Sequence, residues 1–203
     1  MLSLPRSAAV LAVLALALAG CGGGDDDKPT DETTSSSASD DTVDVEAASG
    51  DTIETDDFSY TLPDGWKDAS ESSAAANMPA SAVSLAGDAT DTSDGFTDNV
   101  NVLRLDPAPV TDPDDLEDAA LKELQGVGGS DLKVADRVDV DGSTAIHLSG
   151  SMQTQGINDV IEQFHIIHEG ASYVVTFSFS PDVAQDDRDE VSQSVLASWS
   201  WAA

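Results

Sequence analysis

The sequence is poor in cysteine, in basic side chains and in aromatic rings. Its 203 residues include 1 Cys, 8 Lys and Arg, and 39 Asp and Glu, which gives a net charge of −31. Nucleic acids and anionic bilayers are bound through clustered Lys and Arg, so this balance excludes a nucleic-acid partner. A single cysteine excludes a disulfide within the chain. The hydrophobic content of 40% is nevertheless enough to form the core of one domain.

The chain also lacks an apolar run of the roughly 20 residues that a membrane-spanning helix needs. A shorter run, residues 8–19, consists of Ala, Val and Leu and follows a segment whose one charged side chain is Arg6. This arrangement is typical of a secretory signal peptide. We therefore expect residues 1–20 to be a signal peptide that directs export.

The signal peptide ends in Leu18, Ala19, Gly20 and Cys21. This tetrapeptide resembles the lipobox of bacterial lipoproteins. The resemblance implies cleavage between Gly20 and Cys21, a diacylglyceryl thioether on the Cys21 sulfur and often a further acyl chain on the new amino group. Two or three acyl chains anchor a protein stably, so the expected location is the extracytoplasmic face of the cell membrane. The alternative is an ordinary cleavage site followed by an incidental cysteine.

Residues 21–56 contain 12 acidic side chains against Lys28 and have little to bury. Low hydrophobicity combined with high charge predicts disorder, so we expect an acidic tether between the anchor and the domain. A calcium site at Asp25–Asp27 is the alternative interpretation. Three consecutive Asp side chains point in different directions without a turn framework, which favours the tether.

The predicted domain spans residues 57–203. Asp112 at an N-cap position and Pro113 at the first helical position predict a helix with one apolar face, ended by Gly128. The order of elements predicts an α+β fold, with a largely antiparallel sheet and two helices. Strands are expected at 58–62, 82–86, 100–105, 132–140, 143–152, 160–168 and 171–180, a mobile loop at 88–98, and the second helix within 181–201.

Four spaced patterns in this domain carry a resemblance to a known family: Pro63-x-Gly65-Trp66, Val140-x-Gly142-x-x-Ala145, Tyr173-x-Val175 and Leu196-x-Ser198. Together with the two helices they resemble the PsbP-like α/β/α sandwich. The lipobox and acidic tether are similar to those of the LpqN-type lipoproteins of actinobacteria, which are placed in that superfamily. The resemblance implies a noncatalytic accessory or binding module and carries over no active-site residue.

Sequence motifs for catalysis are missing. Cys21 is taken up by the lipid, and no Gly-x-Ser-x-Gly nucleophile elbow, Gly-x-Gly-x-x-Gly turn or phosphate-binding loop is present. We therefore expect no enzymatic activity and no cofactor. We also expect a monomer.

The three histidines of the sequence are candidate metal ligands. His165 and His168 are three apart, so on a strand they face opposite sides of the sheet and cannot chelate one ion. A turn centred near residue 156 pairs positions whose numbers sum to about 312, which places His147 across from His165. With Glu162 or Glu169 these two histidines would form a divalent-metal site. The favoured interpretation is that they are polar positions on the exposed face of the sheet.

Two further features have simpler explanations. Asp139-x-Asp141-Gly142 resembles part of a calcium-binding loop, but the required acid six residues after the glycine is Leu148, so a hairpin turn is expected. Trp199 lies on the apolar face of the second helix and is expected in the core. Trp66, Trp201 and Met78 complete the candidate apolar set, with Trp201 and Met78 expected nearer the surface. Packing is favoured over a ligand patch.

The sequence therefore predicts a lipid-anchored, extracytoplasmic, non-enzymatic module. Its partner is expected to be a protein or an apolar ligand, the latter in a cleft beneath the 88–98 loop if the sheet and helix leave one. A divalent-metal-binding lipoprotein using His147 and His165 is the first alternative. An envelope-acting hydrolase is the second alternative, and no motif supports it.

Overall fold

The computed structural model describes residues 45–90, 96–154 and 157–202. The predicted signal peptide, the lipobox from Leu18 to Cys21 and the acidic run Asp25–Asp27 lie outside these ranges, as does part of the 88–98 loop. None of the helices in the described part is long and apolar enough to cross a membrane.

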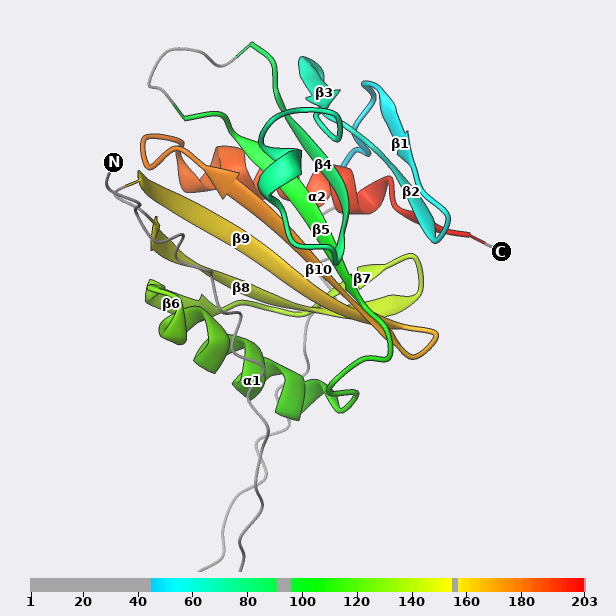
Figure 1. The fold of residues 1–203 in the computed structure, drawn as a ribbon, viewed down its shortest axis with the longest axis vertical. Helices are drawn as coiled ribbons and strands as arrows, with labels where there is room; N and C mark the ends of the chain where they lie inside the picture. Colours follow the sequence, from blue (N-terminus) through cyan, green and yellow to red (C-terminus); the bar gives the residue numbers. More distant parts are fainter. Residues whose placement is uncertain (1–44, 91–95, 155–156, 203) are drawn as a thin grey trace, which may run out of the picture. The chain divides into compact units, whose positions relative to one another are not determined.

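An eight-stranded antiparallel sheet forms the centre of the domain (Figure 1). Its strand order is β3-β4-β5-β10-β9-β8-β6, and β7 also pairs with β8. Alternation of apolar and polar residues gives each central strand two distinct faces. The strands are β3 (Trp66–Asp68), β4 (Ala82–Asp88), β5 (Asn99–Leu105), β6 (Ser130–Val134), β7 (Val138–Val140), β8 (Ser143–Thr154), β9 (Ile157–His168) and β10 (Ala171–Phe179).

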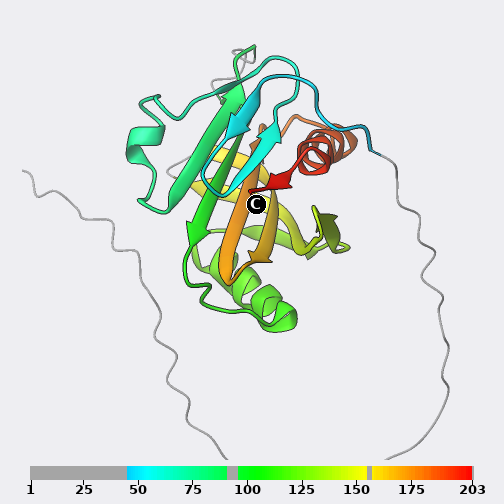
Figure 2. The same ribbon diagram turned by 90° about the vertical axis from the view of Figure 1, so that its right-hand side faces the viewer.

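A second, three-stranded sheet joins the two ends of the domain. It has the order β1-β2-β11, with β1 at Thr52–Glu54, β2 at Phe58–Thr61 and β11 at Ser200–Trp201. Figure 2 shows the blue and cyan strands beside the red C-terminal segment. The sequence assigned residues 52–56 to the tether, and that boundary is wrong. Although Asp51 and Glu54 lie close by in the sequence, Ile53 is buried and β1 pairs with β2 along its whole length.

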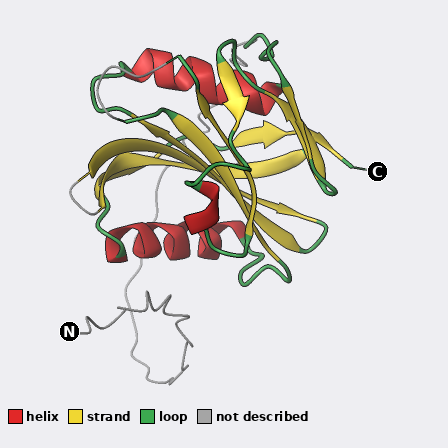
Figure 3. Ribbon diagram, turned by 45° about the horizontal axis from the view of Figure 1, so that its top comes forward, coloured by secondary structure: helices red, strands yellow, loops and turns green. Residues whose placement is uncertain are grey.

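The two helices cover opposite faces of the large sheet (Figure 3). Helix α1 (Pro113–Gly126) begins at the predicted cap, where Oδ1 of Asp112 accepts hydrogen bonds from the backbone N–H groups of Asp114 and Asp115. Helix α2 (Gln185–Ala197) lies on the other face with the small sheet. A short 3₁₀ helix, η1 (Ala75–Asn77), lies on the α1 side. The expected α+β architecture with two helices is thus confirmed.

Two apolar cores result from this layering. The larger lies between the α2 face of the sheet and the small sheet, and it includes Phe58, Tyr60, Phe177 and Trp199. The smaller lies under α1, where Leu116, Ala120 and Leu124 pack against Ile146, Leu148 and Ile161 of β8 and β9. Because α1 covers only this part of its face, the remainder of that face is left for other contacts.

One turn prediction is confirmed and one strand prediction is wrong. The Asp141-Gly142 hairpin turn is confirmed, with positive φ angles of 47° and 79° and a hydrogen bond from the Gly142 N–H to Asp139 Oδ1. The single strand predicted for 132–140 is wrong. It is split into β6 and β7, which pair with different parts of the same strand, β8.

Candidate functional site

The α1 side of the large sheet carries a band of uncharged polar side chains between the two segments that cover it. Helix α1 packs over β8 and β9, and the segment around η1 packs against β4. Between them lie residues of β5, β10 and β9 that are half-buried, apart from the more deeply buried His165. We call this surface the polar face; its residues are Asn99, Asn101, Gln163, His165, Thr176 and Ser178. The half-buried apolar side chains of Leu103 and Val174 lie beside them, in the row of His165.

The strand register aligns these side chains in a row that runs across the strands. Leu85 of β4 is opposite Asn101, which is opposite Thr176, which in turn is opposite Gln163. Residues opposite one another in adjacent strands project from the same face of the sheet. The row therefore begins at an apolar residue beside η1, crosses the polar face and ends next to the α1 core.

Hydrogen bonds fix the orientation of the polar face. Gln163 donates its side-chain N–H to Oγ1 of Thr176 at 2.9 Å. Oε1 of the same amide accepts from Nε2 of His165 at 2.8 Å. Because an amide oxygen only accepts, Nε2 carries the imidazole proton and Nδ1 keeps its lone pair.

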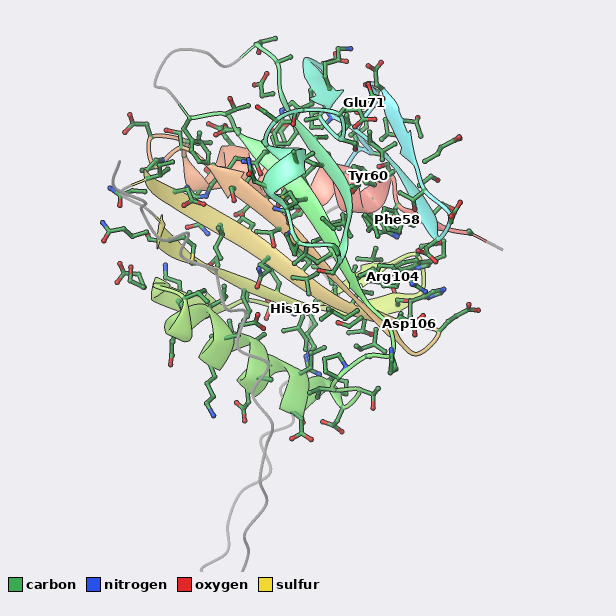
Figure 4. The ribbon with its side chains drawn as sticks, in the orientation of Figure 1. Phe58, Tyr60, Glu71, Arg104, Asp106 and His165 are labelled. Atoms are coloured by element: carbon green, nitrogen blue, oxygen red, sulfur yellow. The ribbon has the colours of Figure 1, made fainter. Side chains whose placement is uncertain are left out.

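His165 is the most unusual member of the polar face. It is only 5% exposed, and burial lowers the pKa of its imidazole to about 4, so the ring is neutral at neutral pH. Its Nδ1 has no hydrogen-bond partner among the described residues. Among the described residues, Trp199 Nε1 is the one fully buried side-chain nitrogen or oxygen atom that has no hydrogen-bond partner. His165 Nδ1 also has no partner but is not fully buried, so it retains contact with solvent. Figure 4 shows His165 on the α1 side of the sheet.

A small apolar cavity adjoins the polar face beside η1. Its volume is about 150 Å³, and the part formed by β4 includes Leu85, the first residue of the cross-strand row. Met78, one of the candidate apolar residues, forms part of the opposite wall and is half-buried. The rest of the lining consists of Ser70, Ala75, Pro79, Ala82, Val83 and Ser84.

The other face of the sheet holds a buried charged cluster that the sequence did not indicate. Glu162 has an exposed fraction of 0%, and its Oε2 lies 2.8 Å from Nε2 of His147. Its Oε1 accepts from Nε of Arg188 on α2 at 3.3 Å. Burial is the largest cause of a raised pKa at the neighbouring Asp189, and the negative charge of Glu162 raises this pKa further. This cluster connects α2 to β8 and β9, which is a structural role.

The predicted metal pair does not form. His165 is opposite Ile146 in the register, and His147 is opposite Phe164, so the two histidines lie on opposite faces of the sheet. Both are buried, at 8% and 5% exposure, which also corrects their expected place on an exposed face. The described residues contain no group of three or more His, Cys, Asp or Glu that could hold a metal. Glu169 lies apart, in the β9–β10 turn.

A serine and a histidine meet at the C-terminal end of β9. Oγ of Ser143 is 3.0 Å from Nδ1 of His168, whose ring stacks on Trp201 with centroids 4.1 Å apart. No carboxylate is hydrogen-bonded to this imidazole within the described ranges. The indole N–H of Trp201 donates to the carbonyl oxygen of Val140, so the ring fastens β11 to the large sheet.

The remaining tryptophans have packing roles. Trp199 is buried as expected and stacks on Phe58 at 4.3 Å and on Tyr60 at 5.3 Å. Trp66 is also buried, at the start of β3. The half-buried Trp201 serves as a clasp, so the preference for packing over a ligand patch agrees with the contacts of all three.

Solved structures with a similar fold include the two described next, whereas no protein-family model and no curated protein matches the chain. LpqN of Mycobacterium tuberculosis, involved in cell envelope biogenesis, is 16% identical with a TM-score of 0.52, covering 76% of this chain and 86% of that one. The cyanobacterial PsbP (CyanoP) of Synechocystis is 13% identical with a TM-score of 0.52, covering 78% and 96%. The PsbP-like fold expected from the sequence is thus confirmed.

Proposed function

We propose that this protein is a lipid-anchored lipoprotein of the cell envelope whose folded domain is a non-enzymatic module that binds a partner protein. The observation that carries the proposal is the lipobox-like sequence from Leu18 to Cys21 ahead of a PsbP-like fold. The likeness of that fold to LpqN, a protein involved in cell envelope biogenesis, supports the same location.

The polar face is the surface that we assign to the partner. It is the part of the sheet that neither α1 nor the η1 segment covers, and it presents hydrogen-bonding groups held in a fixed arrangement. A partner protein is favoured over a lipid because the neighbouring cavity, at about 150 Å³, is below the roughly 300 Å³ at which ligand pockets begin.

The geometry gives little support to the two alternatives. A metal site loses its ligand pair, because His147 and His165 lie on opposite sides of the sheet. A hydrolase needs a nucleophile with an oriented base. Among the residues that the structure describes, none provides a third group that orients the imidazole of the hydrogen-bonded pair Ser143 and His168. The non-enzymatic assignment rests on these two arguments.

Replacing Cys21 tests the anchor. We expect the wild-type chain in the membrane fraction, with an intact mass that shows loss of residues 1–20 and gain of acyl chains. Cys21→Ser should remain uncleaved or become soluble, whereas Ser35→Ala should behave as wild type. Unchanged mass and unchanged membrane retention in Cys21→Ser would show that the lipoprotein assignment is wrong.

Site-specific crosslinking in intact membranes tests the partner. A photoreactive residue at position 101, on the polar face, should yield a crosslinked protein band. The same residue at position 185, on exposed α2, is the matched control and should not yield that band. Identical crosslinks from both positions, or none from position 101, would argue against binding through the polar face.

A further inference from the structure

The polar face has the length of a short extended peptide. The row from Leu85 through Asn101 and Thr176 to Gln163 spans three strand spacings. At about 4.8 Å each, this is roughly 14 Å. An extended polypeptide advances about 3.3 Å per residue, so four residues cover the same distance. One extended segment crossing the strands therefore reaches from the apolar cavity to the polar end of the row.

The chemistry of the row matches a polypeptide backbone. Amide and hydroxyl groups offer both donors and acceptors. His165 adds Nδ1, an acceptor that has no partner among the described residues and that a backbone N–H of the segment would satisfy. Sugar-binding sites generally add an aromatic ring that stacks on the sugar. The α1-side residues of β5, β9 and β10 include no Phe, Tyr or Trp, because the aromatic residues of these strands face the larger core.

The charges around the polar face exclude an anionic partner. None of its six residues is Lys or Arg, and Asp159, on the same face of β9, is hydrogen-bonded to Ser178. Helix α1, which borders the face, carries five acidic side chains against Lys122. On the other border, the segment 69–81 has Glu71 as its one charged residue. An approaching segment is therefore favoured when it is uncharged or basic.

The cavity at the start of the row fits one apolar side chain. A volume of about 150 Å³ is the size of an engineered apolar cavity known to hold benzene. Leu85, Met78 and Pro79 supply apolar walls, and the cavity opens to solvent. An aliphatic side chain placed here anchors the first residue of a segment whose backbone then crosses the polar face.

We propose that the polar face binds an extended, uncharged or basic segment of a partner protein, with one aliphatic side chain in the cavity and the following backbone hydrogen-bonded across Asn101, Thr176 and Gln163 as far as His165. This inference rests on the proposed function, because it specifies the partner of the same surface. Anchoring at Cys21 does not depend on it, so the membrane fractionation above and the binding experiment below fail independently.

Selection from a phage-displayed library of random dodecapeptides tests the proposal, with the full-length protein immobilised in detergent micelles. We expect enrichment of peptides that carry one Leu, Ile or Met and no net negative charge. A synthetic peptide of the enriched sequence should then bind the wild-type protein in a calorimetric titration. No enrichment over the unselected library, or enrichment of acidic peptides, would overturn the proposal.

Three variants locate the binding. Asn101→Arg places a cation and extra volume in the middle of the row, and Ala75→Leu fills the cavity. Each variant should raise the Kd for the peptide at least about tenfold. Gln185→Arg makes the same charge change on exposed α2 and should alter the Kd by less than about twofold. Far-ultraviolet circular dichroism and thermal unfolding confirm that each variant folds. Equal binding of the peptide to wild type and to Asn101→Arg would overturn the assignment. If either Asn101→Arg or Ala75→Leu fails to fold, the other variant decides.

Two further titrations separate the remaining occupants. Maltohexaose is the probe for a neutral glycan. If maltohexaose shifts the NMR signals of the polar-face residues and none of the selected peptides does, the proposal is overturned in favour of a glycan site. Light scattering of the purified protein tests self-association. A dimer that Asn101→Arg dissociates and Gln185→Arg does not would assign the face to a second copy of this chain instead.

Discussion

The carboxylate of Glu162 lies 2.8 Å from Nε2 of His147 inside the core, on the sheet face that α2 covers. The two residues are on neighbouring strands but are not opposite one another, since Glu162 is paired with Ser149 in the register. Arg188 approaches the other carboxylate oxygen from α2. A buried carboxylate with both oxygens occupied therefore holds the helix to the sheet.

Removal of this carboxylate should destabilise the domain strongly. Glu162→Ala leaves Arg188 and His147 without their buried partner, so we expect the free energy of unfolding to fall by about 3 kcal/mol or more. Denaturant unfolding at pH 7 measures this change. Glu190→Ala, an exposed acid on the same helix, is the control and should change the stability by less than about 0.5 kcal/mol. A similar small loss in both variants would contradict a role for the cluster.

His165 should make the fold sensitive to mild acid. The folded protein holds the imidazole pKa near 4, below its ordinary value of 6.5, because the charged ring is poorly solvated there. The unfolded chain takes up the proton first, so this contribution to stability is complete above pH 6.5 and is lost as the pH falls toward 4. Its size is about 3 kcal/mol.

The variant His165→Gln isolates that contribution, because the other titrating groups are common to both proteins. The stability difference between wild type and variant should shrink as the pH falls from 7 to 4, measured by urea unfolding at each pH. An NMR titration of the wild-type His165 ring should give a midpoint near 4. A midpoint near 6.5 would show that the ring is solvated.

Tyr60 should produce a loss of stability in alkali. Burial raises the pKa of its hydroxyl to about 12, although the hydrogen bond with Ser84 acts in the opposite direction. The folded state keeps the phenol proton that the unfolded chain releases near pH 10. Stability from this source is therefore complete below pH 10 and declines by about 3 kcal/mol between pH 10 and pH 12.

Comparison with Tyr60→Phe tests this decline. At pH 7 the variant should be less stable by about 1 kcal/mol, because Ser84 loses its buried partner. Between pH 10 and pH 12 the order should reverse. Parallel stability curves over that range would mean that the hydroxyl ionises in the folded state as readily as in the unfolded chain.

The first strand of the small sheet should be required for full stability. A chain beginning at Val45 keeps β1, whereas one beginning at Asp57 loses it and exposes the surface that Ile53 covers. Burial of one such side chain contributes about 1.5 to 3 kcal/mol, so the free energy of unfolding of the shorter chain should be lower by at least that amount. Its denaturant midpoint should fall accordingly. Equal midpoints would indicate that the domain begins at residue 57, as the sequence suggested.

The cap of α1 should contribute modestly. Oδ1 of Asp112 accepts two backbone N–H groups, at 3.1 and 3.2 Å. Asp112→Ala removes both bonds and should lower the free energy of unfolding by about 1 kcal/mol. Asp112→Asn retains an acceptor and should lose less than half of that. Thermal unfolding of the two variants side by side gives the comparison.

Local chemistry predicted the helices and the tight turns. Asp112 and Pro113 mark the start of α1, and Asp141-Gly142 forms the expected turn because both residues tolerate positive φ angles. The small sheet was not predicted, because β1 and β11 are too short to show a period and exist through pairing with β2. Such pairing between distant segments leaves no local pattern in the sequence.

The site shows how one residue of register changes an inference. The sequence placed the hairpin centre so that paired positions sum to 312, which puts His147 opposite His165. The observed pairs, such as Ile146 with His165, sum to 311. Because side chains alternate between faces, this single step moves His147 to the opposite side of the sheet. The hydrogen bonds of the polar face join Gln163 to Thr176 and His165, and no local pattern in the sequence indicates them.

The pairing of β11 with β2 has a consequence for how the chain becomes folded. Ser200 is hydrogen-bonded in register with Ser59, so the small sheet requires residues about 140 apart in sequence. A chain made from its N-terminus cannot complete this sheet until Ser200 and Trp201 are available. For a protein that crosses a membrane before it folds, as we propose, this arrangement delays completion of the small sheet until β11 has crossed.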